Sequence, residues 1–592
     1  MIHDLAIDPR QQLPAVDLCI IGSGPAGMTL ARELSRSGFA IAVLESGRRQ
    51  PTRRGDALRL VQSEGIQIKE YSRERVLGGS STAWSGLSAP LDEIDLEDRP
   101  WLRHSGWPLA RDELLAYWDA AAERYHFAPL HEYAPGGFDK VKTKGDPCPH
   151  WKTLQEKVFL ARAEAQDFGA DHGEVFELPG VDLYLDATVQ RLCADGSEDC
   201  IQRAALRTAA GQELEISAKI FVLATGGLEN PRLLLSSTDL CAAGLGNEHD
   251  QVGRYLMNHP KNYHGIVRLA QPARELPWLF GCLVGDYAGY AGLHLPPETQ
   301  REQGLLNAYV RFEPLFPWSD CKGVEALVYL VKRSRSVGGL MTKRSRGGKL
   351  VNLRDYSETG DDSDLQNQRK RWTDYLVLLV TVLVNLPMVL RYVVARVRDR
   401  KAPKISRVRL RNFLEMEPDP DNRVVLGSEP DIDGRPITVV RHGATAIDKR
   451  SIVAVHEALA SDLEASGFGT LQGPLTGAED PWPIDQDASH HMGTTRMGHD
   501  PASSVVRPDG RLHTVANVYL AGSSVFPTSG CANPTLTLVA LSIRLAEELS
   551  RQLSQRPGAQ ESAEPSPLSS TWTPPAGSAQ PAELPDEEDG AP

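Results

Sequence analysis

The sequence lacks any pair of cysteines at the spacing of a metal-binding motif. Its eight cysteines are scattered through 592 residues, and no Cys-x-x-Cys occurs. This absence argues against a zinc centre, an iron–sulfur cluster or a covalently attached haem, so we expect no metal. Cys193 and Cys200 could form a disulfide bond, but free thiols in a reducing compartment are the favoured interpretation.

A secretory signal and a basic surplus are also missing. The first 15 residues contain no basic segment followed by an apolar stretch, so we expect a cytoplasmic protein. The net charge of −14 argues against a nucleic-acid partner. The hydrophobic content of 41% is ordinary for a folded chain, and the length suits two or three domains of about 150 residues. Residues 557–592 are rich in Pro, Ser, Ala and Glu, which predicts a disordered tail.

A βαβ unit with a glycine-rich turn is predicted near the N-terminus. The apolar strand Val16 to Ile21 runs into Gly22-Ser-Gly-Pro-Ala-Gly27, a helical pattern follows, and a strand from Ala40 to Leu44 ends at Glu45. In such a dinucleotide fingerprint the first glycine makes the turn, the second admits the pyrophosphate and the third packs helix on strand. Glu45 can accept hydrogen bonds from ribose hydroxyls and would repel a 2′-phosphate, which disfavours NADP.

Further elements are predicted from hydrophobic periodicity and turn residues. Amphipathic patterns indicate helices over 110–125 and 451–466, and a final helix over 536–553 that Pro534 opens. Residues 183–225 indicate short strands with turns at 195–196 and 211–212, ending in an apolar strand over 220–223.

A second glycine-rich run favours FAD over NAD. It reads Arg75-Val-Leu-Gly-Gly-Ser-Ser-Thr-Ala-Trp84. The run offers additional backbone donors and hydroxyls at Gly78, Gly79, Ser80 and Ser81, as an extended cofactor with a tricyclic ring requires.

Four more segments carry a resemblance to a known family. They are Phe221-Val-Leu-Ala-Thr-Gly-Gly-Leu-Glu-Asn-Pro-Arg-Leu-Leu-Leu235, Val252-Gly-Arg-Tyr-Leu-Met-Asn-His-Pro260, His490-His-Met-Gly-Thr-Thr-Arg-Met-Gly498 and Asn517 to Thr537. In order and spacing they resemble the glucose–methanol–choline (GMC) oxidoreductases, with pyranose oxidases and bacterial sugar or polyol dehydrogenases nearest in motif. The resemblance is poor over 260–480.

The resemblance implies an α/β fold with two domains. A discontinuous Rossmann-like FAD domain would comprise 14–100, 183–260 and 485–553. An α+β substrate domain and lid on an antiparallel sheet would comprise 101–182 and 261–484.

The resemblance also implies catalytic and cofactor residues. His490 matches the base beside the flavin, and Asn533 matches its partner. Ser85, Gly522, Pro534 and Thr535 match flavin-site positions. Pyranose oxidases carry a flavin-linked histidine where this chain has Ala83, so noncovalent FAD is expected.

The residue types suit oxidation of an alcohol carbon. A histidine can take the hydroxyl proton near neutral pH, and a neutral amide can hold the same hydroxyl without competing for the proton. His491 is the main rival to His490, but adjacent side chains of an extended segment point to opposite sides. Arg496 could contact an anion or form a salt bridge, and His259, His499 and His513 are interpreted as structural or surface residues.

An unusual insertion occupies residues 332–411. It holds 20 Lys and Arg against 7 Asp and Glu, a net charge of +13 that leaves −27 for the rest of the chain. Its apolar run of 16 residues, 375–390, would span only about 24 Å as a helix, short of the ~30 Å hydrocarbon core. The family's discontinuous FAD domain also rules out a single crossing.

Three interpretations of residues 372–397 remain open: interfacial attachment to a membrane, a buried helix, or an oligomer contact. Basic flanks favour peripheral membrane contact through 369–400, at the inner face of the membrane. We therefore expect FAD-dependent oxidation of a sugar, polyol or other alcohol, with oxygen or a quinone as acceptor. The main alternative is a quinone-linked dehydrogenase at a membrane surface that acts on a lipid-linked or hydrophobic alcohol, and the second is a lyase with structural FAD. Nothing in the sequence identifies the substrate.

Overall fold

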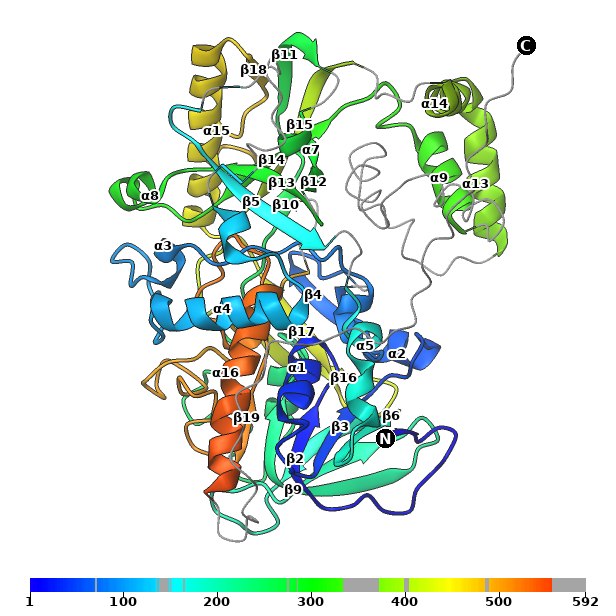
Figure 1. Ribbon diagram of the computed structural model, residues 1–592, viewed down its shortest axis with the longest axis vertical. Coiled ribbons are helices and arrows are strands. Elements are labelled where there is room, and N and C mark those ends of the chain that lie inside the picture. The colour runs from blue at the N-terminus through cyan, green and yellow to red at the C-terminus, as the bar shows by residue number, and fades with distance from the viewer. Residues whose placement is uncertain are drawn as a thin grey trace, which may run out of the picture.

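The computed structural model describes most of the chain. The described residues are 1–69, 72–134, 136–137, 149, 151–162, 166–273, 276–284, 286–333, 372–398, 404–484 and 489–555. The predicted tail and much of the basic insertion lie outside these ranges. The lower domain in Figure 1 contains the first and the last helix of the described chain, and the upper domain is built on a second sheet.

The lower domain is built on a largely parallel sheet. Its strands run in the order β1-β6-β3-β2-β9-β8-β7, and β19 pairs with β9. Pairing is parallel except where β8 lies antiparallel to β7 and β9. The strands are β1 Ile2–Asp4, β2 Val16–Ile21, β3 Ile41–Glu45, β6 Val181–Leu185, β7 Thr188–Cys193, β8 Arg203–Arg207, β9 Glu213–Leu223 and β19 Val518–Leu520.

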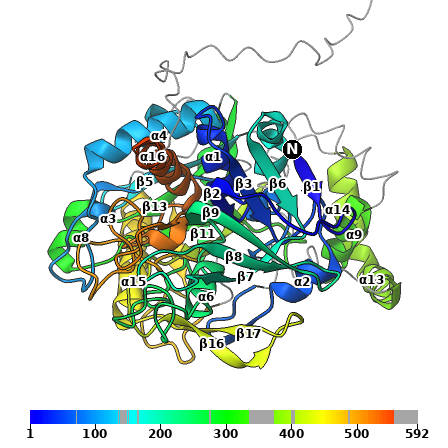
Figure 2. The ribbon, with the colours of Figure 1, turned by 90° about the horizontal axis from the view of Figure 1, so that it is seen from below.

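The central strands are buried because helices cover the sheet. All five residues of β3 and the last four of β2 are buried. Helix α1 (Pro25–Leu34) follows β2 and packs against α16 (Thr535–Ser554), which in turn packs against α4 (Arg111–Tyr125). Figure 2 shows these three helices side by side over one face of the sheet. The N-terminal and C-terminal motifs are thereby brought to one edge.

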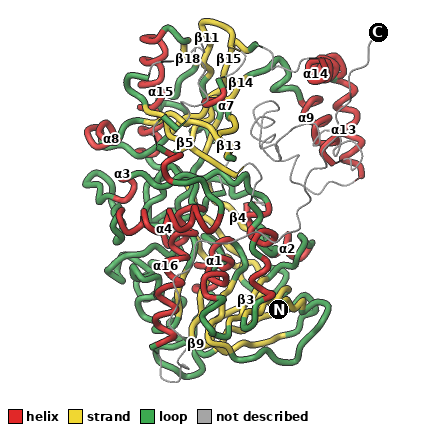
Figure 3. Tube along the Cα trace, viewed as in Figure 1, coloured by secondary structure: helices red, strands yellow, loops and turns green. Residues whose placement is uncertain are grey.

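The upper domain is built on an antiparallel sheet. Its order is β12-β13-β14-β15-β11-β18, with β10 pairing β15 and β5 pairing β13. Helix α15 (Ala446–Ser466) covers one side (Figure 3). The strands are β5 Gln155–Arg162, β10 Lys261–Asn262, β11 Ile266–Ala273, β12 Cys282–Val284, β13 Tyr287–His294, β14 Tyr309–Pro314, β15 Ile405–Phe413 and β18 Gly469–Gln472.

The chain also forms a small third sheet and several short helices. The third sheet is β16-β17-β4, in which β4 (Val61–Gly65) pairs in parallel with β17 (Pro436–His442) and β16 is Arg423–Pro430. The remaining helices are α2 Arg53–Leu58, η2 Gly79–Thr82, α3 Glu93–Leu96, η3 Leu130–Tyr133, α5 Phe168–Asp171, η5 Gly173–Glu177, α6 Glu229–Leu235, α7 Pro277–Phe280, α8 Pro297–Gln303 and η7 Ser523–Val525.

Three helices project beside the upper domain at the right of Figure 1. They are α9 (Lys322–Arg333), α13 (Trp372–Val384) and α14 (Leu386–Arg398). A Cβ on Gly323 of α9 would lie 2.3 Å from the Asn385 Cβ, so glycine allows close packing at the bend between α13 and α14. No single described helix is long and apolar enough to cross a membrane; α13 and α14 meet length and composition only as a pair bent by 81°.

The predicted fold class is confirmed: a Rossmann-like sheet and an antiparallel α+β domain are both present. The predicted helices correspond to α4, α15 and α16, and the predicted βαβ unit to β2, α1 and β3. Cys193 and Cys200 are both free thiols, as favoured. The domain boundaries stay a prediction; α4, from predicted segment 101–182, packs on α16, and β17, from 261–484, pairs with β4.

Candidate active site

One cavity of about 390 Å³ joins the two domains. Its lower end is lined by the glycine-rich turn after β2, and its upper end by strands β10, β13, β14 and β15. Of the predicted site residues, the following line it: Gly22, Gly24, Glu45, Gly79, Ser80, Ser81, Ser85, His490, Gly522, Asn533, Pro534 and Thr535. Motifs that lie far apart in the sequence therefore surround a single space.

The first glycine motif has one glycine open to the cavity and two in close packing. A Cβ on Gly27 would lie 2.0 Å from the Gly22 carbonyl oxygen, and one on Gly22 would lie 2.7 Å from the Ala224 carbonyl oxygen. A Cβ on Gly24 would meet nothing within 4 Å. Gly24 is also the N-cap of α1, whose first N–H groups and positive dipole end would face an anion bound at this place.

Glu45 has a structural task in addition to lining the cavity. Its Oε2 accepts from the Ser23 backbone N–H at 3.0 Å and from the Ser23 hydroxyl at 2.7 Å, and its Oε1 accepts from the Gly47 N–H at 2.8 Å. The carboxylate thus holds the fingerprint turn against the end of β3. The Ser46 hydroxyl also donates to Oε1, at 3.4 Å, so a ribose hydroxyl would take the place of this longest of the four bonds.

The second glycine motif packs directly onto the first. Gly78 has a φ of +89° and Gly79 a φ of +55°, and a Cβ on Gly79 would lie 2.9 Å from the Gly24 Cα. The Gly78 N–H donates to the Ser23 carbonyl at 3.1 Å. Ser81 is buried, and its hydroxyl donates to the Gly78 carbonyl and accepts from the Phe168 N–H. Gly78 and Ser81 therefore shape the loop, while Ser80 and Ser85 are exposed to the cavity.

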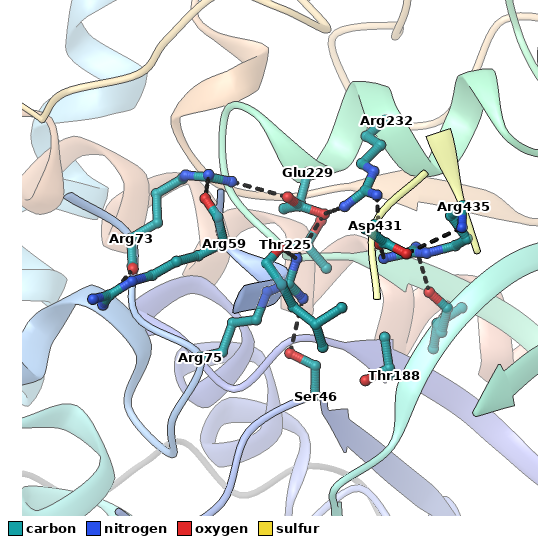
Figure 4. Close-up of polar contacts among 12 residues, drawn as sticks. Ser46, Arg59, Arg73, Arg75, Thr188, Thr225, Glu229, Arg232, Asp431 and Arg435 are labelled. Atoms are coloured by element: carbon teal, nitrogen blue, oxygen red, sulfur yellow. Dashed lines mark hydrogen bonds and ion pairs between the residues drawn. The ribbon is translucent and has the colours of Figure 1, made fainter. Parts of the chain in front are cut away.

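A largely buried ion network holds this loop, as Figure 4 shows. Glu229 of α6 pairs with Arg73 and Arg75 at 2.9 Å each and with Arg232 at 3.4 Å. Burial alone would raise the pKa of Glu229, but the surrounding guanidinium groups hold it well below its usual range. Arg75 also donates to the Ser46 hydroxyl at 3.0 Å, which ties the loop to the end of β3.

The C-terminal motif supplies the opposite wall. Gly522 has a φ of +98° and faces Ala26 of α1, and Pro534 caps α16 at the cavity. Thr528 donates to the Asp95 carbonyl at 2.6 Å and accepts from the Trp107 indole N–H at 2.7 Å. These bonds fix the loop that carries Asn533.

His490 and Asn533 are in direct contact. The Asn533 amide nitrogen lies 3.3 Å from His490 Nε2, and the His490 backbone N–H donates to the Asn258 side-chain oxygen at 3.0 Å. Both side chains are half-buried on the cavity wall. His491 also lines the cavity, but its backbone carbonyl accepts from Ser523 and packs against Gly227, so its own position is fixed by the wall.

His259, which the sequence analysis interpreted as structural, lies in direct contact with His490. Its Nδ1 lies 2.9 Å from His490 Nδ1, and its Nε2 lies 2.8 Å from the Gly530 carbonyl oxygen. The signal available in the sequence was its place in the motif Val252 to Pro260. Burial lowers the pKa of His259 to about 4, so the ring is neutral at pH 7.

These contacts determine the tautomer of both rings. A carbonyl can only accept, so His259 carries its proton on Nε2 and presents a bare Nδ1. His490 must then donate from Nδ1, which leaves its Nε2 unprotonated. Asn533 donates toward that Nε2. The chain Gly530–His259–His490–Asn533 therefore aims one basic nitrogen at the cavity.

Arg496 forms no ion pair with any described residue. It donates to the His104 carbonyl at 2.7 Å and lies over the Tyr255 ring at 4.6 Å. It is buried and does not line the cavity, so it contacts neither a cofactor nor a substrate there.

The residues fit an FAD at this site. The open space at Gly24, the start of α1 and the acid at the end of β3 suit the pyrophosphate and ribose. The cavity continues past Ala83, Ser85 and the start of α16 to His490. A cofactor longer than a mononucleotide needs a cavity of this extent. No group of His, Cys, Asp and Glu that could hold a metal ion occurs in the described part of the chain.

The fold and site define a two-domain, dinucleotide-dependent oxidoreductase. Residues 418–542 match the family model described as GMC oxidoreductase, and residues 20–51 match an NAD(P)-binding Rossmann-like domain. The chain is therefore similar to the GMC oxidoreductases over its C-terminal part, and this similarity supports FAD as the cofactor.

Known proteins of this kind align over most of the chain. A 6'''-hydroxyparomomycin C oxidase of Streptomyces lividus is 23% identical over 93% of this chain and 94% of that protein. The fructose dehydrogenase large subunit of Gluconobacter japonicus is 25% identical over 58% of this chain and 49% of that protein. A formate oxidase structure aligns with a TM-score of 0.53 at 15% identity, covering 92% of this chain and 99% of that one, which supports the fold.

Proposed function

We propose that this protein oxidises a CH–OH group of a sugar, polyol or related alcohol, with His490 as base and Asn533 as its partner. The contact between the Asn533 amide and the unprotonated Nε2 of His490 carries the proposal. Bound FAD would supply the hydride acceptor. Gly24, Glu45, Gly79, Ser80, Ser85 and Thr535 would hold it without a covalent bond, because Ala83 offers no nucleophile.

The chain's own residues would act on the alcohol as follows. His490 Nε2 takes the hydroxyl proton, which makes the carbon a better hydride donor. Asn533 donates to the substrate oxygen and holds the carbon at reaction distance. His259 accepts from the His490 Nδ1–H throughout and remains neutral. The N-terminus of α16 directs its positive dipole end toward the cavity, where it stabilises negative charge.

Anaerobic addition of alcohols to the holoenzyme tests this function. We expect a sugar or polyol to bleach the flavin absorbance band, and acid precipitation to release free FAD into the supernatant. Reoxidation by oxygen and by a soluble quinone then identifies the acceptor. Conversion of a substrate without bleaching would instead support a lyase, and FAD that stays with the precipitate would contradict noncovalent binding.

We further propose that α13 and α14 attach the enzyme to an anionic lipid surface. Leu378, Val389 and Tyr392 are buried, while the opposite face exposes apolar side chains. The exposed residues are Leu376, Val377, Leu379, Val380, Leu383, Val384, Leu386, Leu390, Val393 and Val394. Monomeric proteins rarely expose so continuous an apolar face. The +13 charge of residues 332–411 complements anionic headgroups, whereas the −27 of the remainder disfavours a second copy.

Vesicle flotation tests the attachment. We expect the intact chain to float with phosphatidylglycerol vesicles and to float less in high salt, because screening weakens the headgroup attraction. The double variant Leu383→Asp/Val384→Asp, at residues 65% and 77% exposed, should lose at least about tenfold in bound fraction. Ile432→Asp, at a residue 56% exposed elsewhere, is the control. Equal flotation of the double variant, or dimerisation abolished by it, would refute the lipid proposal.

A further inference from the structure

The upper wall of the cavity carries an unusual row of cations. Side chains on one face of an antiparallel sheet recur every second residue, so Tyr309, Arg311 and Glu313 of β14 share a face. They pair in register with Phe413, Arg411 and Arg409 of β15. Lys261 of β10 pairs with Phe413 on the same face. Lys261, Tyr290, Tyr309, Arg311, Arg411 and Phe413 all line the cavity that also contains His490.

Arg311 stands directly opposite Arg411 in this sheet. Both side chains are buried, with 3% and 6% exposure. Like charges at paired positions of two strands repel, and burial weakens the screening by water. Such an arrangement costs stability unless an anion lies between or beside the two groups.

The described carboxylates neutralise only one of the two arginines. Glu313 pairs with Arg409 at 3.0 Å and with Arg411 at 3.4 Å. No described carboxylate lies within ion-pair distance of Arg311, whose Nε has no hydrogen-bond partner. Its contacts are the Tyr290 ring, with the guanidinium 4.1 Å from the centroid, and the Phe280 carbonyl at 3.5 Å.

Two carboxylates that are close to His490 in the sequence are not counted in this charge balance. Asp485 and Asp487 shortly precede His490 in the sequence and lie outside the described residues. A carboxylate of the chain would be present with or without an added anion. Anion titration and the melting temperature of Arg311→Met therefore distinguish such a carboxylate from a bound ligand.

We propose that Arg311 binds an oxyanion of the substrate, so that the oxidised alcohol is an acid or a phosphate ester rather than a neutral or cationic sugar. Arginine presents a planar fork that matches a carboxylate or phosphate, and a charge-assisted bond in a dry cavity is strong and orienting. The Tyr290 ring fixes the guanidinium plane beforehand. This inference rests on the proposed function, since it names the substrate class of the same site.

Anion binding is measured on the oxidised holoenzyme without turnover. Inorganic phosphate and acetate, which carry no oxidisable alcohol, are titrated while the flavin spectrum and fluorescence are followed. We expect saturable binding of at least one of them. Arg311→Met should weaken it about 10- to 100-fold, the range expected for a lost charge-assisted bond, and Arg311→Lys should restore part of the loss. Arg407→Met, at an exposed arginine of the same strand as Arg411, should bind as the wild type does.

The melting temperature separates a binding arginine from a structural one. Arg311→Met removes a buried cation that no described carboxylate pairs, so it should melt at the same temperature as the wild type or higher. A strong loss of stability in Arg311→Met would show that a carboxylate of the chain already pairs with Arg311, and would overturn the proposal.

Substrate preference completes the test. Glucuronate, glucose 6-phosphate, glucose and glucosamine share a ring and differ in charge. We expect one of the two anions to reduce the flavin at least about tenfold faster than glucose at equal low concentration, with the advantage lost in Arg311→Met. Glucose or glucosamine reducing the flavin faster than both anions would overturn the oxyanion inference alone. No reduction by any alcohol in a broad screen would instead overturn the proposed function.

Discussion

Replacing His490 by alanine is expected to slow flavin reduction about 100- to 10,000-fold, the usual contribution of a general base. The Nε2 of this ring is the basic nitrogen that the hydrogen-bond chain aims at the cavity. Without it, Asn533 remains and can still hold the hydroxyl, but it cannot accept the proton. Substrate affinity should therefore change much less than the reduction rate.

Stopped-flow reduction under anaerobic conditions measures this effect, with FAD content determined for each preparation. FAD should be retained, because His490 is not among the residues proposed to hold it. His499→Ala is the control, since His499 is exposed and does not line the cavity. A reduction rate within a few fold of the wild type in His490→Ala would contradict the role of base.

The cofactor end of this site could be predicted from local sequence because its demands are local. Gly27 packs against the turn five residues earlier, and only glycine fits a Cβ position 2.0 Å from a carbonyl oxygen. Glu45 lies one strand after the turn, and its spacing follows from the length of a βαβ unit. Such contacts within one supersecondary unit leave a pattern in consecutive residues.

The substrate end could not be predicted in the same way. Arg311 and Arg411 meet only because β14 and β15 pair in a particular register across a hundred residues of chain. Their significance depends on Glu313 neutralising one and leaving the other, which no local pattern records. The alternation of Tyr309, Arg311 and Glu313 indicates a shared face but not what that face covers.

For the insertion, the composition of the sequence predicted an apolar helix but not how that segment bends or which face it exposes. The apolar run predicted a helix too short to cross a membrane, and the structure instead has two helices bent by 81°. Ten exposed aliphatic residues disfavour the buried-helix interpretation. The contact between Asn385 and Gly323 of α9 determines which face of α13 and α14 is hidden, and the sequence does not record this contact.

His259 permits the second large effect, through a pair of near-isosteric variants. In His259→Gln the side-chain amide can still donate to the Gly530 carbonyl from the position of Nε2, but nothing accepts from His490 Nδ1. In His259→Asn an oxygen near the position of Nδ1 can accept from His490, while the contact to Gly530 is lost. Each variant therefore keeps one of the two hydrogen bonds of the His259 ring and removes the other.

We expect His259→Gln to slow flavin reduction about 100- to 1,000-fold, because His490 can then adopt the tautomer that protonates Nε2. This lies between the 10- to 100-fold typical of an orienting neighbour and the ~10,000-fold of a fully wrong tautomer. His259→Asn should recover at least about tenfold of that loss. A purely structural His259 would instead make the two variants equally slow, or the asparagine variant the slower.

The pH dependence of unfolding provides an independent check. An unfolded histidine titrates near pH 6.5, whereas burial lowers the pKa of folded His259 to about 4. Between these values the unfolded chain binds the extra proton, so the free energy of unfolding should fall as pH falls from 6.5 to 4. In both His259 variants the free energy of unfolding should fall less steeply between pH 6.5 and pH 4 than in the wild type, as measured by urea unfolding. An unchanged slope would mean that His259 is not the neutral, buried ring that fixes the His490 tautomer.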